Sequence, residues 1–167
     1  MKSAQYWIEH LQMIPHPEGG YYLRPHISTE SFIRKDIPGV YTSERKLWTS
    51  EYMLIEAMQK QSFHRVRSDE MWYYHAGAPL KVHVIDQDGH YQQAVLGLDI
   101  SENQRPQYHI PKNSIVALEG DLDLYSLIGV MISPGFDMDD FTLFSRDELV
   151  ARHPQHKELI EQFTEVY

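Results

Sequence analysis

The chain of 167 residues contains no cysteine. This absence excludes disulfide bonds, thiol catalysis and every zinc or iron–sulfur site that needs thiolate ligands. A bound metal would have to use histidine, aspartate, glutamate or water.

Basic residues are also scarce, with 15 lysines and arginines against 24 aspartates and glutamates and a net charge of −9. The sequence has no lysine- or arginine-rich run of the kind that follows a nucleic-acid backbone. We therefore expect no nucleic-acid partner.

Long apolar segments are absent as well. Apolar runs such as residues 127–132 are far too short to cross a bilayer, and residues 1–10 lack the basic and apolar regions of a signal peptide. We expect no membrane partner and a cytoplasmic location.

The composition is that of an ordinary globular domain, with 42% hydrophobic and 23% charged residues. The length fits one domain with its own core, so residues 1–167 are expected to form a single domain. No internal repeat or low-complexity tract divides the chain.

The N-terminal segment predicts a short helix followed by a loop. Ser3 can cap a helix in which Trp7 and Leu11 lie one turn apart, and Pro15 ends it. Residues 15–26 contain three prolines and a pair of glycines, which indicates a shaped loop.

Most of the remaining chain reads as short strands separated by turn signals. Residues 47–58 fit a helix by propensity, but their context favours a strand. Further strands are predicted at 61–67, 70–75, 80–86, 91–96, 107–110, 115–118 and 124–132. Many short strands with little helix between them indicate an all-β antiparallel sandwich or barrel.

Helices return at the C-terminus. Residues 145–148, SRDE, form a capping box, and Pro154 suits the first turn of a second helix that ends near Phe163. These helices are expected to pack against the barrel.

The segment FHRVRSDEMWYYHAG, residues 63–77, contains the residues best suited to chemistry. His64 and Val66 lie on one face of a strand, because side chains alternate with a period of two. A turn after Val66 brings Glu70 onto a neighbouring strand beside them.

The spacing of His64, Glu70 and Gly77 resembles the first motif of the cupin superfamily. The chain further resembles the fifth cupin type, a family of unknown function, in the blocks HPEGGYY, SFHRVRSDEMW, QRPQ, SPGFDMDDF and DELVARHP. This resemblance implies a double-stranded β-helix, or cupin jelly roll, with a short N-terminal helix and C-terminal helices. It also implies a homodimer and a pocket inside the barrel.

The sequence departs from the metal-binding form of the cupin motifs. Two of the four ligand positions read Val66 and Val116, which cannot coordinate a metal. We therefore expect no cofactor. The alternative is a divalent transition metal bound by His64, Glu70 and His83 in a dioxygenase-like enzyme.

A metal-free role is suggested by a more distant resemblance, through the shared fold, to the cupin-like epimerases of deoxysugar-nucleotide synthesis. That resemblance implies that His64 abstracts a proton next to a carbonyl, and His is a suitable base near neutral pH. Tyr52, Tyr73 or Tyr108 would supply the acid.

The sequence allows two interactions for the Glu70 side chain. It either orients His64 by accepting its second N–H or forms an ion pair with Arg65 or Arg67. His64 itself is either functional or a structural histidine retained with the fold.

The candidate site residues fall into two groups. The catalytic candidates are His64, Glu70 and Tyr73. The ligand-binding candidates are Tyr52, Phe63, Arg65, Trp72, His83, Arg105 and Phe141. The HPEGGYY and PGFD segments are predicted to be loops at the pocket mouth. Six histidines are predicted to be exposed: His10, His16, His26, His90, His153 and His156.

Three functions remain open at this point. The first is binding of a small polar or sugar-like molecule in the barrel, with metal-free isomerase or epimerase chemistry. The second is the metal-dependent enzyme, and the third is a non-enzymatic binding or scaffold dimer. The sequence identifies neither the substrate nor the reaction.

Overall fold

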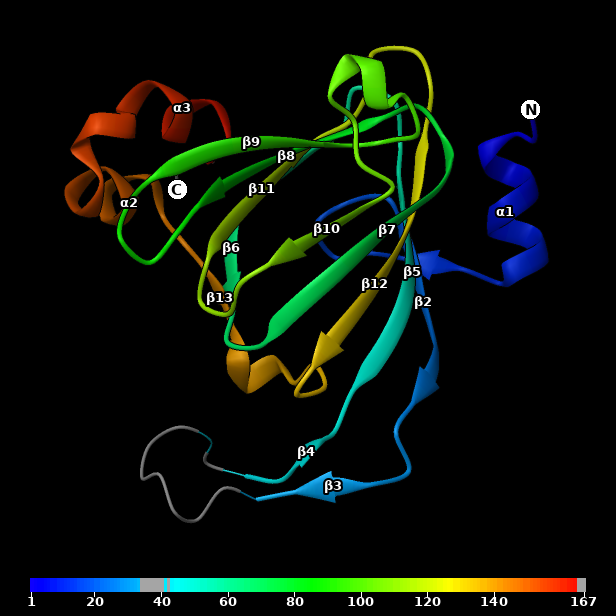
Figure 1. Cartoon of the computed structure of the whole chain (residues 1–167), viewed down its shortest axis with the longest axis horizontal. Coiled ribbons are helices and arrows are strands. Elements are labelled where there is room, and N and C mark those ends of the chain that lie inside the picture. Colours follow the sequence, from blue (N-terminus) through cyan, green and yellow to red (C-terminus); the bar gives the residue numbers. More distant parts are fainter. Residues whose placement is uncertain (34–40, 42, 165–167) are drawn as a thin grey trace.

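The computed structural model of the protein describes residues 1–33, 41 and 43–164. Two antiparallel sheets face each other and form a barrel, with α1 on one side and α2 and α3 on the other (Figure 1). The six-stranded sheet has the order β1 (Ile14–Pro15), β2 (Tyr21–Ile27), β5 (Thr49–Ile55), β12 (Ser126–Ser133), β7 (Asp69–Gly77) and β10 (Gln107–Ile110). The five-stranded sheet has the order β13 (Phe141–Leu143), β6 (Lys60–Val66), β11 (Ile115–Glu119), β8 (Leu80–Ile85) and β9 (Tyr91–Leu96). The predicted all-β jelly roll is confirmed.

A small hairpin and the helices complete the structure. Strands β3 (Ser31–Phe32) and β4 (Arg45–Lys46) pair with each other and extend away from the barrel (Figure 1). The helical elements are α1 (Ala4–Leu11), η1 (Ile100–Glu102), η2 (Met138–Asp140), α2 (Arg146–Arg152), η3 (Pro154–His156) and α3 (Lys157–Gln162). Among the described residues, every helix is too short or too polar to cross a bilayer.

The predicted helix caps are confirmed. The Ser3 hydroxyl accepts a hydrogen bond from the Tyr6 amide, and the Ser145 hydroxyl accepts one from the Glu148 amide. Each bond satisfies an amide that the first helical turn leaves without a partner. Pro154 begins the 3₁₀ turn that leads into α3, as its position in the sequence predicts.

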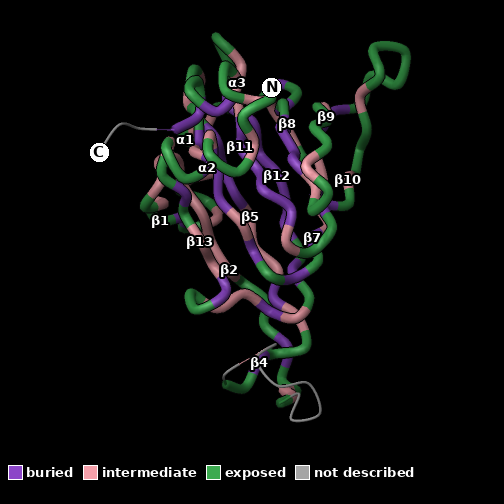
Figure 2. Tube along the Cα trace, turned by 90° about the vertical axis from the view of Figure 1, so that its left-hand side faces the viewer, coloured by how far each residue is buried: buried purple, intermediate pink, exposed green. Residues whose placement is uncertain are grey.

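Side-chain alternation along the strands separates the barrel interior from two outer packing layers. In β6, Val66 joins the central apolar cluster, which also contains Val82 and Val130 from other strands. Phe63 joins instead the cluster beneath α2 and α3. A third cluster, containing Leu54, lies beneath α1. Figure 2 accordingly shows buried residues along the central strands and exposed residues in the outer loops.

The expectation for residues 15–26 needs correction, because a strand, β2, begins at Tyr21. β2 pairs with β5, and the pairing shifts register between Leu23 and His26, around Pro25. Proline has no amide hydrogen to donate to a neighbouring strand, which explains why the prolines suggest a loop. The loop itself is confined to the residues before Tyr21.

Two residues of the cupin-like motifs have left-handed backbone conformations. Gly77 has a φ of 93°, and a Cβ there would clash with the carbonyl oxygen of Tyr125. Asn113, at a position where the family pattern has glycine, has a φ of 64°. Asparagine tolerates this conformation better than most residues, so the turn before β11 is kept.

Candidate functional site in the barrel

A cavity of about 230 Å³ opens into the barrel between the two sheets. Its aromatic and apolar walls are formed mainly by Tyr22, Met53, Val66, Trp72, Val130, Ile132, Phe136 and Phe141. Its polar lining consists of His16, Glu18, Arg24, Glu51, Gln61, His64 and Glu70. The cavity is therefore a mostly apolar chamber with a few converging polar groups, as is usual for small-molecule sites.

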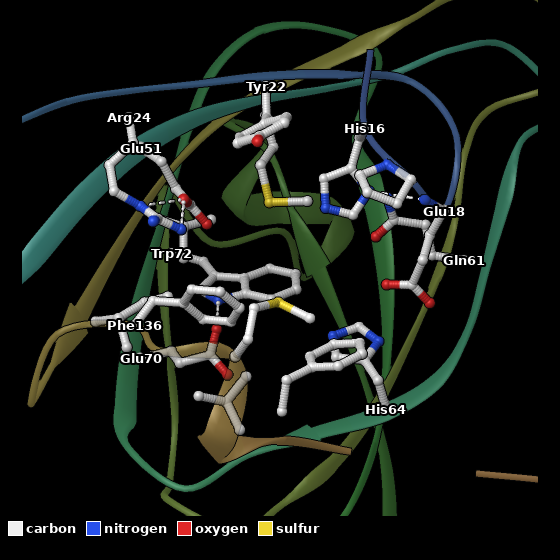
Figure 3. A pocket seen from close by; sticks show the side chains of 17 residues that line it. His16, Glu18, Tyr22, Arg24, Glu51, Gln61, His64, Glu70, Trp72 and Phe136 are labelled. Carbon is white, nitrogen blue, oxygen red and sulfur yellow. Dashed lines mark hydrogen bonds and ion pairs between the residues drawn. The ribbon is translucent and has the colours of Figure 1, made fainter. Parts of the chain in front are cut away.

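His64 and Glu70 lie on facing sheets, because β6 belongs to the five-stranded sheet and β7 to the six-stranded sheet. The short turn at Arg67 and Ser68 joins the two strands. Figure 3 shows the two side chains on different sides of the cavity. The predicted turn thus brings both residues to one cavity.

The hydrogen bonds of His64 define its tautomer. Its Nδ1 lies 2.9 Å from the Ser62 carbonyl oxygen, which can only accept, so Nδ1 carries the hydrogen. In the neutral ring Nε2 then holds the lone pair. The ring stacks on Phe141 with 5.5 Å between ring centroids. Packing and hydrogen bonding therefore fix the imidazole with Nε2 as its basic atom.

Glu70 is almost completely buried, with 5% of its surface exposed. Its Oε2 accepts a hydrogen bond of 3.0 Å from the Trp72 indole. Burial raises the pKa of Glu70 to about 7, against the opposing effects of the Trp72 bond and the charge of His64. The sequence predicts a hydrogen bond from His64 or an ion pair with Arg65 or Arg67. The hydrogen bond that Glu70 accepts comes instead from Trp72.

His16 and Glu18 belong to the loop before β2. The Glu18 amide donates to His16 Nδ1 over 3.1 Å, so Nε2 carries the hydrogen of the neutral His16 ring. Burial, aided by His64, lowers the pKa of His16, which keeps the ring neutral near pH 7. Burial raises the pKa of Glu18, and its Oε1 is buried without a hydrogen-bond partner.

Arg24 and Glu51 form an ion pair at the cavity wall. Arg24 Nε and Nη2 lie 3.0 and 2.9 Å from Glu51 Oε2. The guanidinium also lies 4.8 Å from the centre of the Phe136 ring. Burial raises the pKa of Glu51, although Arg24 opposes this effect.

Four of the candidates from the sequence line the cavity: His64, Glu70, Trp72 and Phe141. Two others lie on the outer side of the six-stranded sheet. Tyr52 packs with the cluster beneath α1, and Tyr73 follows the inward-facing Trp72 and therefore points to the opposite face. Neither reaches the cavity.

Phe63, Arg65 and His83 lie on the outer face of the five-stranded sheet. Phe63 and Arg65 flank His64 in β6, and alternation turns them towards Phe163 and Phe144 respectively. His83 lies between the inward-facing Val82 and Val84.

The environment of His83 is that of a structural histidine. Its Nδ1 is 2.9 Å from the Tyr91 hydroxyl, and its Nε2 is 3.3 Å from Glu119 Oε2. Burial lowers its pKa.

Two further candidates lie outside the cavity lining. The exposed Arg105 donates to the Gln104 carbonyl oxygen, and Tyr108 packs against the edge of the central core. Neither therefore joins His64 and Glu70.

Several lining residues are missing from the sequence prediction: His16, Glu18, Tyr22, Arg24, Glu51, Gln61 and Phe136. The reading of His16 as an exposed loop histidine is wrong. The sequence did indicate part of this lining, because the segments HPEGGYY and PGFD are predicted to lie at the pocket mouth. These two segments supply His16, Glu18, Tyr22 and Phe136 to the cavity.

Two of the cupin ligand positions are aliphatic in the described part of the barrel and cannot coordinate a metal. Val66 and the buried Val116 occupy two ligand positions, and His83 lies on the outer face of its sheet. Within residues 1–33, 41 and 43–164, the one group of three or more His, Asp and Glu ligand atoms within 4.8 Å of one another is Asp86, Asp88 and His90. That group lies in the turn between β8 and β9, outside the cavity.

The fold and this cavity define the chain as a cupin. Residues 5–144 match the family described as Cupin superfamily (DUF985), and the chain belongs to this family. No curated protein matches the chain.

Two similar structures cover nearly the whole chain. Protein SO0799 from Shewanella oneidensis is 38% identical over 100% of both chains, with a TM-score of 0.87. A hypothetical protein from Leishmania major is 32% identical over 99% of this chain and 100% of its own, with a TM-score of 0.86.

A more distant similarity concerns the fold alone. A variant of oxalate decarboxylase from Bacillus subtilis is 15% identical over 92% of this chain and 38% of its own, with a TM-score of 0.52.

Proposed function

We propose that the chain binds a small polar, sugar-like carbonyl compound in the barrel cavity and transfers protons without a metal, as isomerases and epimerases do. The observation that carries this proposal is the carboxyl group of Glu70, buried in the cavity with a pKa of about 7, on the wall facing His64. Titratable groups with strongly shifted pKa values in a cavity are typical of catalytic sites.

His64 acts as the base in this proposal. Its Nδ1–H is held by the Ser62 carbonyl, so Nε2 accepts the proton from the carbon next to the substrate carbonyl. The electrons of the C–H bond form the enol double bond, and the carbonyl oxygen gains a proton.

Glu70 supplies that proton. A carboxyl group with a pKa of about 7 is protonated in about half of the molecules at neutral pH, so it can donate and then accept again. His16 Nε2–H is a second donor for a substrate oxygen. Return of a proton to carbon completes an isomerisation or an epimerisation with no net change in oxidation state.

The size of the cavity limits the substrate. Its 230 Å³ lie below the range of about 300–1,000 Å³ of pockets that hold drug-sized ligands. A monosaccharide-sized molecule fits this volume better than a whole nucleotide sugar.

The test is deuterium incorporation from heavy water into small aldoses, ketoses and related carbonyl compounds, followed by proton NMR. We expect exchange at the carbon next to the carbonyl with the wild-type chain. Glu70→Gln and His64→Gln should each lower the rate by a factor of about 100 or more.

The matched control is His10→Gln, a change at an exposed histidine of α1, which should keep the wild-type rate. Absence of exchange with every compound, or equal rates in wild type and His64→Gln, would refute the proposed chemistry.

A further inference from the structure

The described cavity lining contains more acidic side chains than lysine or arginine side chains. Arg24 is the one lysine or arginine side chain in the described lining, and it is bound to Glu51. No lysine or arginine of the described lining pairs with Glu18 or Glu70 in this way. The described lining therefore contains two carboxyl groups that no arginine or lysine of the cavity balances.

Both carboxyl groups are poorly satisfied. Glu18 Oε1 has no hydrogen-bond partner, and Glu70 receives a bond from the Trp72 indole. A buried carboxylate is costly unless it is paired and hydrogen-bonded. An anionic ligand would add to this cost by like-charge repulsion, whereas a cationic ligand would reduce it.

The cavity walls also suit a cation. Tyr22, Trp72, Phe136 and Phe141 line the cavity with aromatic rings. Ring faces attract ammonium groups, and carboxylates among aromatic rings are a common arrangement for binding them. One cation is already held this way, since the Arg24 guanidinium lies over Phe136.

We propose that the ligand of this cavity carries a cationic nitrogen group, held by Glu18 among the aromatic walls, and no phosphate or carboxylate group. The inference rests on the proposed function, because it concerns the same cavity. It narrows the substrate class to small amino compounds, such as amino sugars, and excludes nucleotide sugars.

Two matched sets of compounds test the charge preference by calorimetry at pH 7. The first is glucosamine, glucose and glucuronate, and the second is ethanolamine, ethylene glycol and glycolate. In each set we expect the amine to bind at least about tenfold more tightly than the neutral compound, with the acid weakest.

Glu18→Gln should reduce the preference for the amine, and Glu158→Gln, on the exposed face of α3, should leave it unchanged. Binding of neither amine, or tighter binding of the neutral or acidic compound, overturns the inference.

A second measurement does not depend on the choice of compound. In a chain with Trp7→Phe and Trp48→Phe, the fluorescence comes from Trp72, which is 2% exposed and lines the cavity. Relative to its quenching of free tryptophan in the same buffer, caesium should quench Trp72 more strongly than iodide does, and Glu18→Gln should reduce that difference. Equal relative quenching by the two ions, or stronger relative quenching by iodide, contradicts a cation-selective cavity.

The two proposals fail in distinguishable ways. Amine binding without deuterium exchange would keep the ligand class and refute the proton-transfer chemistry. Exchange confined to neutral or acidic compounds would keep the chemistry and refute the ligand class.

Discussion

Replacing Glu70 with glutamine should stabilise the protein at high pH. The pKa of Glu70 is about 7 in the folded chain and 4.5 ordinarily, because burial disfavours the charged form. Between these two values the folded chain binds more protons at this site than the unfolded chain does. The free energy of unfolding therefore falls as pH rises through this window.

The magnitude follows from about 1.4 kcal/mol per pKa unit. Ionisation of Glu70 costs the folded state about 1 kcal/mol at pH 5 and about 3 kcal/mol at pH 8.5. Glutamine has no charge to bury, and its oxygen still accepts the Trp72 bond. The stability gain of Glu70→Gln over wild type should thus grow by about 2 kcal/mol between these two pH values.

Urea unfolding of both chains, followed by circular dichroism at pH 5 and 8.5, measures this gain. Taking the difference between variant and wild type removes the titration of all other groups. Glu158→Gln, an exposed change of the same kind, should show no such growth. A gain that stays constant or shrinks as pH rises would show that the pKa of Glu70 is not raised in the folded chain. The assignment of Glu70 as the proton donor would then be wrong.

Two further predictions concern the fold and the assembly. Gly77→Ala should lower the free energy of unfolding by about 1–3 kcal/mol, because a Cβ at this left-handed position meets the Tyr125 carbonyl oxygen; urea unfolding with no measurable loss would contradict the clash. The family resemblance predicts a homodimer, so light scattering should give twice the mass of one chain, and a monomer at micromolar concentration would refute it.

Much of the fold follows from local patterns in the sequence. The period-two alternation and turn signals predict β6 to β12 closely, for example 91–96 for β9 and 115–118 for β11. The segment 15–26 is predicted less well, because its prolines hide a strand that exists through pairing with β5. Pairing between segments far apart in the sequence is a tertiary effect that no local pattern reports.

The site could be predicted in part, and alternation explains both its successes and its errors. Once His64 faces the cavity, Phe63 and Arg65 must face outwards, and once Trp72 faces inwards, Tyr73 cannot. The sequence alone could therefore have excluded Phe63, Arg65 and Tyr73 from the cavity.

The HPEGGYY segment gave a partial signal for Glu18, because this segment is predicted to lie at the pocket mouth. The contribution of Arg24 could not be predicted in that way, because it depends on the pairing of β2 with β5. No local pattern of the sequence reports that pairing.

The central claim is that His64 and Glu70 transfer protons in a cavity that needs no metal. Its most direct test is the pH dependence of deuterium exchange between pH 5 and 9, using protein dialysed against a strong chelator. The account predicts that exchange survives chelation and declines above about pH 7, as Glu70 loses the proton that it must donate. Exchange that disappears on chelation and returns with added iron, manganese, nickel or zinc, or that keeps rising to pH 9, would contradict the account.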